Sequence, residues 1–584
     1  MKRAPSSPGG PSLLGVSTST ASLGPVYRAE TLNELDGGRF DVVIIGAGIT
    51  GVGCALDAAS RGLSVALIEQ RDISSGTSSR SSKLFHGGLR YLEQFNFKLV
   101  NEALHERELI RQQLAPHLVW PVPFIYPLQH AVWERAYVGA GIMLYDAMAK
   151  LGGNTLPYQW HLSKSDLIDV FPSIKADDFV GGIRYYDAGC DDARFTLAVA
   201  RSAASHGARI LTSARVDGLV REGDAVKGVA ATCLESGRRF EVQAKVVINS
   251  TGVWTDRLET LVGDTHTDVT ASKGIHIVVP KDRIKSRVGF ITKTKTSVLF
   301  LIPHPDFWHI GTTDTPWKLG LAHPAASKTD IDYVLEQANK VVDPPLTHDD
   351  IVGVYAGLRP LVSGDSESTA KLSREHSITV PAPGLVTIAG GKYTTYRVMA
   401  QDTVDRAFES IDTPIPPCIT EQIPLVGADG YHDLRDRVDD LAATYDREPE
   451  DIIRLLRRYG DEATTVLNLA ASDPRLAERI PSGKYLGAEV RFAVDHEAAL
   501  HLDDVLTRRT RLSIECADRG VDGAPFVASI MADALGWDDA AIERELAHYR
   551  ARVEAELESQ LMPDDHTADA ARLGAPDIRT MGSE

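Results

Sequence analysis

The chain has 584 residues, of which 43% are hydrophobic and 24% are charged, and its formal net charge is −18. This length exceeds what one hydrophobic core organises, so we expect two or three domains. The negative charge argues against a general nucleic-acid-binding protein, which usually carries a basic face. The five cysteines lie far apart without a C-x-x-C pair, so we expect free thiols, no disulfide framework and no metal site.

The N-terminal region is predicted to be a leader. Residues 1–38 are rich in Ser, Thr, Pro and Gly and lack the apolar core of a secretory signal, so we expect them to be disordered. No stretch approaches the ~18–20 apolar residues that a membrane-spanning helix needs. The best candidate, residues 136–145, is too short.

Residues 40–69 carry the signature of a dinucleotide-binding unit. An apolar run at 42–45 predicts a buried parallel strand. It is followed by glycines in the spacing G-x-G-x-x-G-x-G, at Gly46, Gly48, Gly51 and Gly53. Such glycines allow a tight turn, close approach of the backbone to a pyrophosphate, and close packing of the helix on the strand. A second strand at 65–68 ends in Glu69, whose carboxylate suits ribose hydroxyls. We therefore predict that a dinucleotide binds at the helix N-terminus.

The segment after this unit is rich in hydroxyl side chains. Because it directly follows the ribose-binding strand, we expect these side chains and the N–H groups between them to contact the cofactor. The predicted contacts are Thr77, Ser78, Ser79, Ser81 and Ser82. His86 follows with Gly87 and Gly88, which let the backbone approach a planar ring, and Arg90 then offers a planar fork of donors suited to an oxyanion.

Two later turns are predicted to reach the same cofactor. An apolar strand at 246–250 ends in Thr251 and Gly252. A strand at 384–389 ends in Gly390 and Gly391, which open a helix whose N-terminus again suits an anion. A plain NAD-binding domain has no need of such late returns, so the pattern favours a flavoprotein.

The remaining segments predict two further units. Residues 254–350 read as an antiparallel sheet with helices, including a helix at 330–342 capped by Thr329. The chain is then expected to return to the nucleotide-binding domain. Residues 420–562 show helical periodicity and predict a helical C-terminal domain, and 563–584 predict a flexible tail.

Six motifs occur in a fixed order along residues 40–400. They are G-A-G-I-T-G-V-G, T-S-S-R-S-S-K-L-F-H-G-G-L-R-Y-L-E, S-K-G-I-H-I-V-V-P, G-T-T-D, Y-A-G-L-R-P-L and G-G-K-Y-T-T-Y-R. Together they resemble the FAD-dependent glycerol-3-phosphate dehydrogenases of aerobic glycerol metabolism, the GlpD family, and residues 502–509 look like that family's C-terminal domain.

The resemblance implies an α/β fold. Its FAD-binding Rossmann domain would be like those of glutathione reductase and D-amino-acid oxidase, joined to an antiparallel-sheet substrate domain and an α-helical C-terminal domain. Within an oxidoreductase region at 39–415, we expect FAD-binding parts at about 39–95, 190–255 and 350–415, and substrate-domain parts at about 96–189 and 256–349.

The resemblance also implies the chemistry. The expected reaction is oxidation of sn-glycerol 3-phosphate to dihydroxyacetone phosphate, with hydride transfer from C2 to flavin N5 and electrons passed to a membrane quinone. Arg90, Arg359 and Lys392 are assigned to substrate binding, the last two also polarising the C2 oxygen. His276 is the expected general base, because an unperturbed histidine titrates near pH ~6.5. Arg359 stays open as an alternative for that role.

Several assignments are left open at this point. Tyr91, Tyr355 and Thr395 are candidate hydrogen-bonding partners of the substrate, and His86 is as suited to a structural role in the cofactor loop as to catalysis. Three rival functions are a glycerol-3-phosphate oxidase that uses oxygen, an FAD enzyme acting on amino or hydroxy acids, and a non-catalytic flavoprotein adaptor. The set of cationic residues favours a phosphorylated substrate.

The expected location is the cytoplasm, with peripheral contact to the inner face of the cell membrane. The net negative charge opposes attraction to anionic lipid, so the contact would be a local patch. The aromatic and apolar segment 133–145 and the helical domain are the candidates. Whether the chain forms a homodimer is left open.

Overall fold

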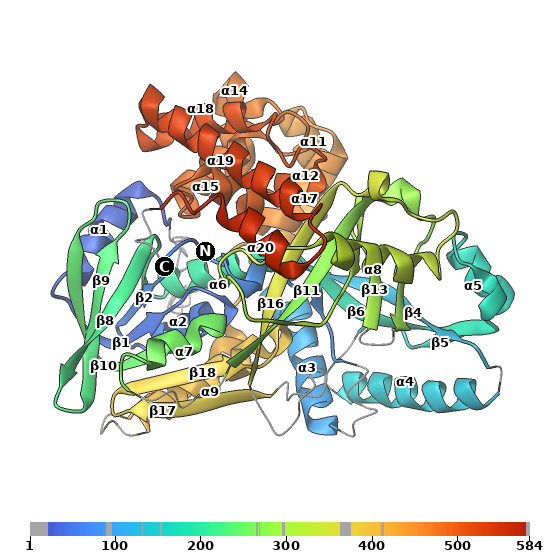
Figure 1. Ribbon diagram of the computed structural model, residues 1–584, viewed down its shortest axis with the longest axis horizontal. Coiled ribbons are helices and arrows are strands. Elements are labelled where there is room, and N and C mark those ends of the chain that lie inside the picture. The colour runs from blue at the N-terminus through green and yellow to red at the C-terminus, as the bar shows by residue number, and fades with distance from the viewer. Residues whose placement is uncertain are drawn as a thin grey trace, which may run out of the picture.

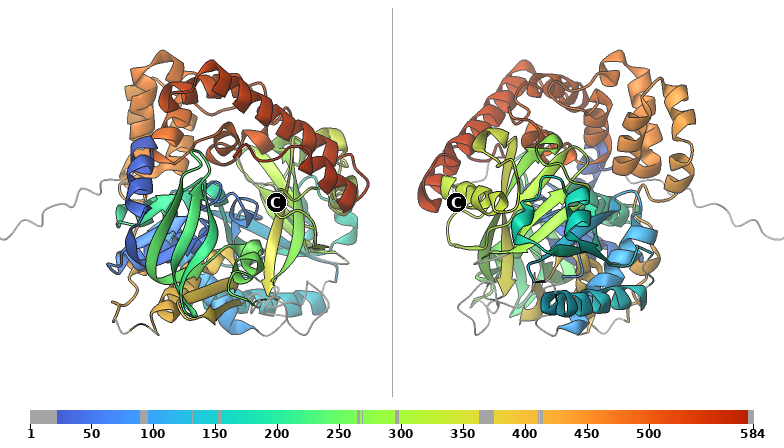
Figure 2. Two further views of the ribbon diagram at one scale, coloured as in Figure 1. Left: turned by 60° about the vertical axis from the view of Figure 1, so that its left-hand side comes forward. Right: turned by 90° about the vertical axis from the view of Figure 1, so that its right-hand side faces the viewer.

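The computed structural model describes residues 22–88, 96–130, 132–151, 153, 155–263, 267, 269–294, 298–362, 375–409, 411 and 414–579. These residues form two β-sheets that lie side by side and a helical domain above them (Figure 1). Both views in Figure 2 show the helical domain covering the same end of the two sheets.

The first sheet is the nucleotide-binding sheet. Its strands are β17 (His376–Ala382), β18 (Leu385–Gly390), β10 (Arg239–Asn249), β1 (Arg39–Ile45), β2 (Val65–Ile68) and β7 (Arg209–Leu211); β9 (Ala225–Cys233) also pairs with β10, and β8 (Ala214–Glu222) pairs with β9. β18, β10, β1, β2 and β7 run parallel to their neighbours in this order. This is the parallel sheet that the apolar run at 42–45 predicted.

Both faces of β1 are buried, which explains its unbroken apolar sequence. Val42 and Ile44 lie in the core that contains side chains of α2 (Ile49–Ser60), α6 (Asp192–Ser205) and α9 (Tyr396–Phe408). Val43 and Ile45 lie in a second core with side chains of the β8–β9–β10 meander. The parallel strands are thus enclosed between helices and a small antiparallel sheet.

The second sheet is the substrate sheet. Its strands are β15 (Thr315–Trp317), β11 (Val269–Pro280), β14 (Phe307–Gly311), β13 (Val298–Pro303), β12 (Gly289–Lys293), β4 (Val119–Leu128), β6 (Gly181–Cys190), β3 (Leu84–Phe85), β16 (Gly353–Val362) and β5 (Trp160–Ser163). Around it lie α3 (Phe97–Leu109), α4 (Trp133–Leu151), α5 (Lys164–Val170) and α8 (Lys328–Asn339). Ile275 and Ile277 face the core beneath α8, so His276 between them lies on the opposite face.

The placement of β16 differs from the prediction for residues 350–415. β16 does not join the nucleotide-binding sheet but pairs with β11 over ten residues, from Val269 opposite Val362 to Val278 opposite Gly353. β11 pairs with β14 and β15 along one edge, and its other edge is free to pair with β16 over most of its length. The strand that carries Arg359 therefore belongs to the substrate sheet.

The helical domain has its own hydrophobic core. Its helices are α10 (Tyr431–Arg435), α11 (Val438–Tyr445), α12 (Pro449–Tyr459), α13 (Ala463–Ser472), α14 (Pro474–Ala477), α15 (Gly487–His496), α16 (Leu502–Asp504), α17 (Leu512–Glu515), α18 (Ala524–Leu535), α19 (Asp539–Ser559) and α20 (Asp565–Leu573). Buried ion pairs join this domain to the nucleotide-binding sheet: Arg508 and Arg509 bind Asp72, at 2.6 and 2.7 Å.

Two predicted disordered segments are ordered where the structure describes them. Residues 25–35 form the helix α1 (Pro25–Leu35), in which Tyr27 donates a 3.1 Å hydrogen bond to the carbonyl of Ala208. Near the C-terminus, α20 packs against the substrate sheet, where Asp565 pairs with the buried Lys273. Low-hydrophobicity composition misled the prediction, because specific long-range polar contacts hold both helices.

The helix predicted at 330–342 begins slightly earlier and has a different cap. The helix is α8, and its N-cap is Ser327, not Thr329. Ser327 and Asp330 exchange side-chain-to-backbone hydrogen bonds in a capping box. The Thr329 hydroxyl instead donates to the carbonyl of Pro563.

Candidate active site

The glycine turn after β1 has the geometry that the sequence predicted. Gly46 adopts a φ of +101°, which L side chains rarely adopt. A Cβ on Gly51 would lie 1.9 Å from the carbonyl oxygen of Gly46, and one on Gly53 would lie 3.0 Å from the Tyr396 ring. Gly51 thus packs the helix against the turn, whereas Gly53 packs it against α9 and not, as predicted, against the strand.

Glu69 closes this turn from the end of β2. One carboxylate oxygen accepts a 2.8 Å hydrogen bond from the N–H of Ala47, and the other accepts one of the same length from the N–H of Arg71. Burial raises the pKa of Glu69, and the two N–H groups oppose that effect. The side chain also lines the adjacent cavity, where it is available to further donors.

A cavity of about 430 Å³ begins at this turn and extends toward the substrate sheet. It is lined by predicted cofactor residues from four distant parts of the chain: Gly46, Gly48, Glu69, Thr77, Ser78, Ser81, Thr251, Gly252, Gly390 and Gly391. Lys392 and Pro360 lie along the same cavity. The predicted late returns of the chain therefore converge on one space.

The cavity fits a dinucleotide. The N-cap of α2 is Gly48, which has no side chain to satisfy the free N–H groups at the N-terminus of the helix. A Cβ on Gly48 would lie only 3.3 Å from Ser78 Oγ, which accepts a 2.9 Å hydrogen bond from the N–H of Ile49. No atom lies within 4 Å of a Cβ built on Gly252, so this side of the cavity is open. These features suit a pyrophosphate close to the backbone.

The other predicted cofactor residues lie beside the cavity and not in its wall. Ser79 uses its carbonyl to accept from Lys83 Nζ, and Ser82 Oγ lies 3.0 Å from His276 Nε2. His86 is held by two hydrogen bonds with Thr394. Gly87 donates to the Tyr145 hydroxyl, and Gly88 has a φ of +76°. These residues shape the loop that joins the cofactor cavity to the substrate sheet.

Sequence reasoning missed several residues of the cavity wall. Arg71 lies two residues after Glu69, with its guanidinium 5.5 Å from the centre of the Trp254 ring. Arg215 and Asp217 reach the wall from β8. Arg71 and Trp254 could have been predicted from the sequence, because Arg71 lies two residues after Glu69 and Trp254 follows the turn at Thr251 and Gly252. Nothing in the sequence pointed to the residues of β8.

His276 lies on the face of the substrate sheet that the register of β11 exposes to the cofactor loop. It stands opposite Tyr355 on β16 and Gly311 on β14. Its ring stacks on Tyr355 with centroids 4.8 Å apart, and a Cβ on Gly311 would lie 2.5 Å from it. Nε2 is 3.0 Å from Ser82 Oγ, while the buried Nδ1 has no hydrogen-bond partner among the residues that the structure describes.

The pKa of His276 differs from the ordinary value assumed in the sequence analysis. Burial, followed by the positive charges of Arg359 and Lys83, lowers it to about 3. The imidazole is therefore neutral at pH 7 and has a lone pair on one ring nitrogen. The expectation of an unperturbed histidine is wrong, because neither the burial nor the neighbouring cations are visible in the local sequence.

Arg359 lies next to His276 on the same side of the sheet. Its guanidinium donates to the carbonyl of Thr313 at 3.1 Å and to Thr312 Oγ1 at 3.0 Å, and it lies 3.6 Å from Asp314. A Cβ on Gly274 would lie 2.4 Å from Nη2, so the glycine in S-K-G-I-H makes room for this side chain. The planar fork is thus fixed in orientation by neighbouring strands.

The remaining predicted substrate residues have different placements. The Tyr355 hydroxyl donates to the carbonyl of Ser81 at 3.1 Å and lies 3.3 Å from His309 Nδ1. Thr395 is buried, and its hydroxyl donates to the carbonyl of Lys392 at 3.5 Å. Both hydroxyls therefore have internal partners. Arg90 and Tyr91 lie outside the described residues.

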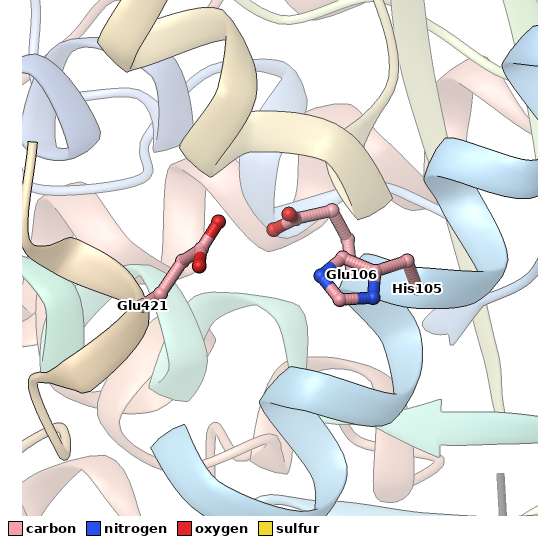
Figure 3. A group of neighbouring side chains, drawn as sticks. All are labelled: His105, Glu106 and Glu421. Atoms are coloured by element: carbon pink, nitrogen blue, oxygen red, sulfur yellow. The ribbon is translucent and has the colours of Figure 1, made fainter. Parts of the chain in front are cut away.

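One group of side chains has the composition of a metal site. His105, Glu106 and Glu421 point toward one another (Figure 3), with possible ligand atoms within 4.8 Å. Arg397 lies between the carboxylates: it binds Glu106 at 2.6 Å and Glu421 at 3.0 Å. Because a guanidinium already bridges both acids, we assign no metal to this group.

The chain matches known families over most of its length. Residues 41–397 match the family model described as FAD dependent oxidoreductase, and residues 418–542 match the C-terminal domain of alpha-glycerophosphate oxidase. Glycerol-3-phosphate dehydrogenase 2 of Mycobacterium tuberculosis H37Rv is 53% identical over 561 residues, which cover 96% of each chain. The mitochondrial glycerol-3-phosphate dehydrogenase of Homo sapiens is 36% identical, with 88% of this chain and 73% of the human chain covered.

A solved structure also resembles the whole molecule. The glycerol-3-phosphate dehydrogenase of Bacillus halodurans, complexed with FAD, has a TM-score of 0.75 and 28% identity, covering 90% of this chain and 97% of that chain. The sequence matches and this structural likeness agree with the glycine turn, the cofactor cavity and the helical domain. The chain therefore belongs to the family of FAD-dependent glycerol-3-phosphate dehydrogenases.

Proposed function

We propose that the protein oxidises sn-glycerol 3-phosphate to dihydroxyacetone phosphate with FAD as its cofactor and a membrane quinone as electron acceptor. The observation that carries this proposal is the position of His276 and Arg359 on the same face of the substrate sheet, beside the loop that lines the cofactor cavity. The names of the relatives at 53% and 36% identity support the substrate.

The cationic residues are assigned to the phosphate and to the C2 oxygen. Arg359 has the planar fork that binds phosphate oxygens bidentately, and Lys392 lies along the cofactor cavity. Arg90 is proposed as a third cation, in keeping with the sequence motif. FAD, when bound, supplies the acceptor for the hydride that leaves C2. Arg359 and Lys392 then stabilise the negative charge that develops on the C2 oxygen.

His276 is proposed to take the proton of the C2 hydroxyl at Nδ1. We assign the ring hydrogen to Nε2, where it is donated to the Ser82 hydroxyl 3.0 Å away, and this assignment leaves the lone pair on Nδ1. A dianionic phosphate bound at Arg359 offsets one of the charges that lower the pKa of His276. Substrate binding thus makes this histidine a stronger base. Arg359 is less suited to that role, because a guanidinium stays protonated at neutral pH.

The exposed side of α4 is proposed as the membrane contact. Trp133, Tyr137 and Met143 of α4 are 62, 62 and 61% exposed, and Val132, just before the helix, is 80% exposed. In Figure 1, α4 lies along the edge of the molecule opposite the helical domain. Trp and Tyr prefer the membrane–water interface, so we propose that α4 lies flat on the lipid at the cytoplasmic face of the cell membrane. None of the described helices has both the length and the apolar character to cross a bilayer.

A flotation assay tests this contact. Wild-type holoenzyme is expected to float with zwitterionic vesicles, and the variant with Trp133→Ser and Tyr137→Ser is expected to stay behind. Leu561→Ser is the matched control, because Leu561 is 72% exposed on the helical domain. Equal flotation of all three proteins would contradict the assignment to α4.

The second candidate function is an oxidase that passes the electrons to oxygen. It is favoured by one observation, the match of residues 418–542 to the C-terminal domain of alpha-glycerophosphate oxidase. The dehydrogenase relatives at 53% identity and the apolar face of α4 favour the quinone.

Anaerobic reduction tests the substrate and the acceptor together. Addition of sn-glycerol 3-phosphate to the yellow holoenzyme is expected to bleach the flavin absorbance, and a quinone analogue is expected to restore it rapidly. Rapid recovery with oxygen would support the oxidase. Absence of bleaching in protein that retains FAD would refute the proposed substrate.

A further inference from the structure

A second cavity, of about 100 Å³, lies between the helical domain, the loop after Ser79 and strand β16. We call it the arginine cavity, because six arginines line it: Arg80, Arg508, Arg511, Arg519, Arg552 and Arg572. The only carboxylates among its lining residues are those of Asp503 and Glu556. The cavity is separate from the cofactor cavity, although both are lined by residues of the same loop.

Two of the arginines are neutralised from outside the cavity. Arg508 pairs with Asp72 at 2.6 Å and with Asp504 at 2.7 Å. Arg511 pairs with Asp191 and Asp192, at 2.5 and 2.6 Å. These pairs join the domains, as buried ion pairs do elsewhere in this interface. The other four arginines have only these two carboxylates among the lining residues, and Asp577, outside the lining, also attracts Arg552.

The remaining pairs are long, and one arginine has none. Arg519 and Arg572 both approach Glu556, at 3.6 and 3.4 Å. Arg552 lies 3.9 Å from Asp503, which also binds Arg508. Among the described residues, Arg80 forms no ion pair.

Arg80 and Arg552 are instead bonded to neutral groups. Arg80 donates one hydrogen bond, of 3.4 Å, to the carbonyl of Ala322. Arg552 has contacts of 3.0 Å with both ring nitrogens of His323. Burial and neighbouring arginines hold the pKa of His323 well below its ordinary value, so its ring is uncharged at neutral pH. Neither arginine gains a full counter-charge from these partners.

The titration behaviour of Arg80 reflects the excess of positive charge. Burial, then the charges of Arg71 and Arg572, lower the pKa of Arg80 to about 9. Burial also lowers the pKa of Arg572. Buried guanidinium groups are ordinarily paired with acids, because an unpaired buried charge is costly. An anion in the cavity would remove this cost.

We propose that the arginine cavity binds one tetrahedral oxyanion, an orthophosphate or the phosphoryl group of a small metabolite, on Arg80, Arg552 and Arg572. Guanidinium groups match phosphate oxygens with paired donors, and a cavity of about 100 Å³ suits a group of this size. The three arginines come from the cofactor loop, α19 and α20, so the anion joins all three elements.

Binding at this cavity is coupled to the cofactor loop. A Cβ on Gly357 would lie 2.6 Å from the carbonyl oxygen of Arg80, so this loop packs directly on β16. Thr77 Oγ1 donates to the carbonyl of Leu358 at 2.7 Å, and Tyr355 donates to that of Ser81. An anion that fixes Arg80 thus stabilises a loop that lines the cofactor cavity and contacts the strand of Arg359.

Thermal unfolding of the holoenzyme in phosphate tests the proposal. At constant ionic strength, replacement of chloride by inorganic phosphate is expected to raise the Tm with a saturable dependence on concentration. Arg80→Gln and Arg552→Gln are expected to weaken the apparent affinity at least about tenfold. Arg550→Gln is the matched control, because Arg550 is an exposed arginine of the same helix as Arg552, and it should keep the wild-type affinity.

Further arms separate the remaining possibilities. In chloride alone, Arg80→Gln is expected to unfold at or above the wild-type Tm, because the substitution removes a buried positive charge. Loss of the phosphate effect in this variant would therefore not be explained by misfolding. Glycerol 2-phosphate in place of phosphate shows which source binds more tightly. Loss of the phosphate effect in Arg359→Gln, with the effect retained in both cavity variants, would place the anion at the substrate site and overturn the proposal. Equal phosphate effects in all variants would also overturn it.

Discussion

The two sides of the active site are built in different ways. The cofactor side consists mainly of backbone, turns and small residues, with Gly46, Gly48 and Gly252 along the cavity. The substrate side consists of long charged or aromatic side chains, such as His276 and Arg359, held by strand register. A pyrophosphate needs close N–H groups, whereas a small phosphate monoester needs convergent cations. We therefore expect substitutions on the two sides to impair different properties of the enzyme.

The helical domain supports the cofactor side more than the substrate side. Asp72, three residues after Glu69, is buried and binds both Arg508 and Arg509. His501 bridges the two parts of the molecule, with its ring nitrogens 2.8 Å from Glu545 and 3.0 Å from Glu235. The C-terminal domain thus holds the loop that directly follows Glu69.

The largest effect is expected from Gly51→Ala. The added Cβ meets the backbone oxygen of Gly46 at 1.9 Å, so the turn must move, and we expect loss of bound FAD and of all activity. Flavin absorbance per protein measures this. Gly141→Ala is the control, because a Cβ at this helical glycine meets no atom within 4 Å. Full flavin content in Gly51→Ala would contradict the assignment of this turn to the cofactor.

Arg359→Ala breaks the substrate side and should spare the cofactor side. We expect kcat/KM to fall at least about 10³-fold, because the fixed guanidinium for the phosphate and C2 oxygen is lost. The protein should remain yellow. Arg283→Ala, at a half-buried arginine of the same sheet region that pairs with Asp350, should keep wild-type kinetics. Full activity in Arg359→Ala would exclude the proposed role.

His276→Asn removes the proposed base. We expect kcat to fall about 10²-fold with FAD retained, the typical contribution of a general base. Ser82→Ala should cost less, because it only loosens the tautomer of the ring. Because the pKa of His276 is lowered to about 3, its protonation should not reduce activity between pH 6 and 8. Single-turnover flavin reduction measures each effect; an unchanged rate in His276→Asn would exclude the role.

The smallest effect on catalysis is expected from His501→Gln, which tests the support from the helical domain. Burial lowers the pKa of His501, but its bonds to Glu235 and Glu545 outweigh this and raise it to about 9. The unfolded value is ~6.5, so the stabilisation is complete below that pH and is lost as the pH rises through 9. The variant should lose about 3 kcal/mol of unfolding free energy at pH 6 and little at pH 9.5.

Denaturant unfolding at the two pH values measures this difference. His432→Gln is the control, because His432 is exposed on α10 and makes no ion pair among the described residues. A loss for His501→Gln that is the same at pH 6 and pH 9.5 would show that the imidazole acts by packing and not by its charge.

The sequence alone determined the cofactor side. The glycine turn, the carboxylate of Glu69 and the returns at Thr251 and Gly390 all line one cavity. These features can be predicted from the sequence because each depends on a few consecutive residues: a strand, a turn that only glycine allows, and a helix N-terminus. The order of the six motifs also identified the family, because the motifs are spread over residues 40–400.

Only the tertiary structure determined the burial, the neighbours and the pKa values of the charged residues. The pairing of β11 with β16 placed His276 beside Tyr355 and near Arg359, and the resulting burial moved the pKa of His276. The same holds for Arg80, whose lack of an acidic partner within the described part of the chain depends on helices more than 400 residues away. Local sequence specifies backbone conformation, but burial and electrostatic potential sum over neighbours that only the folded chain brings together.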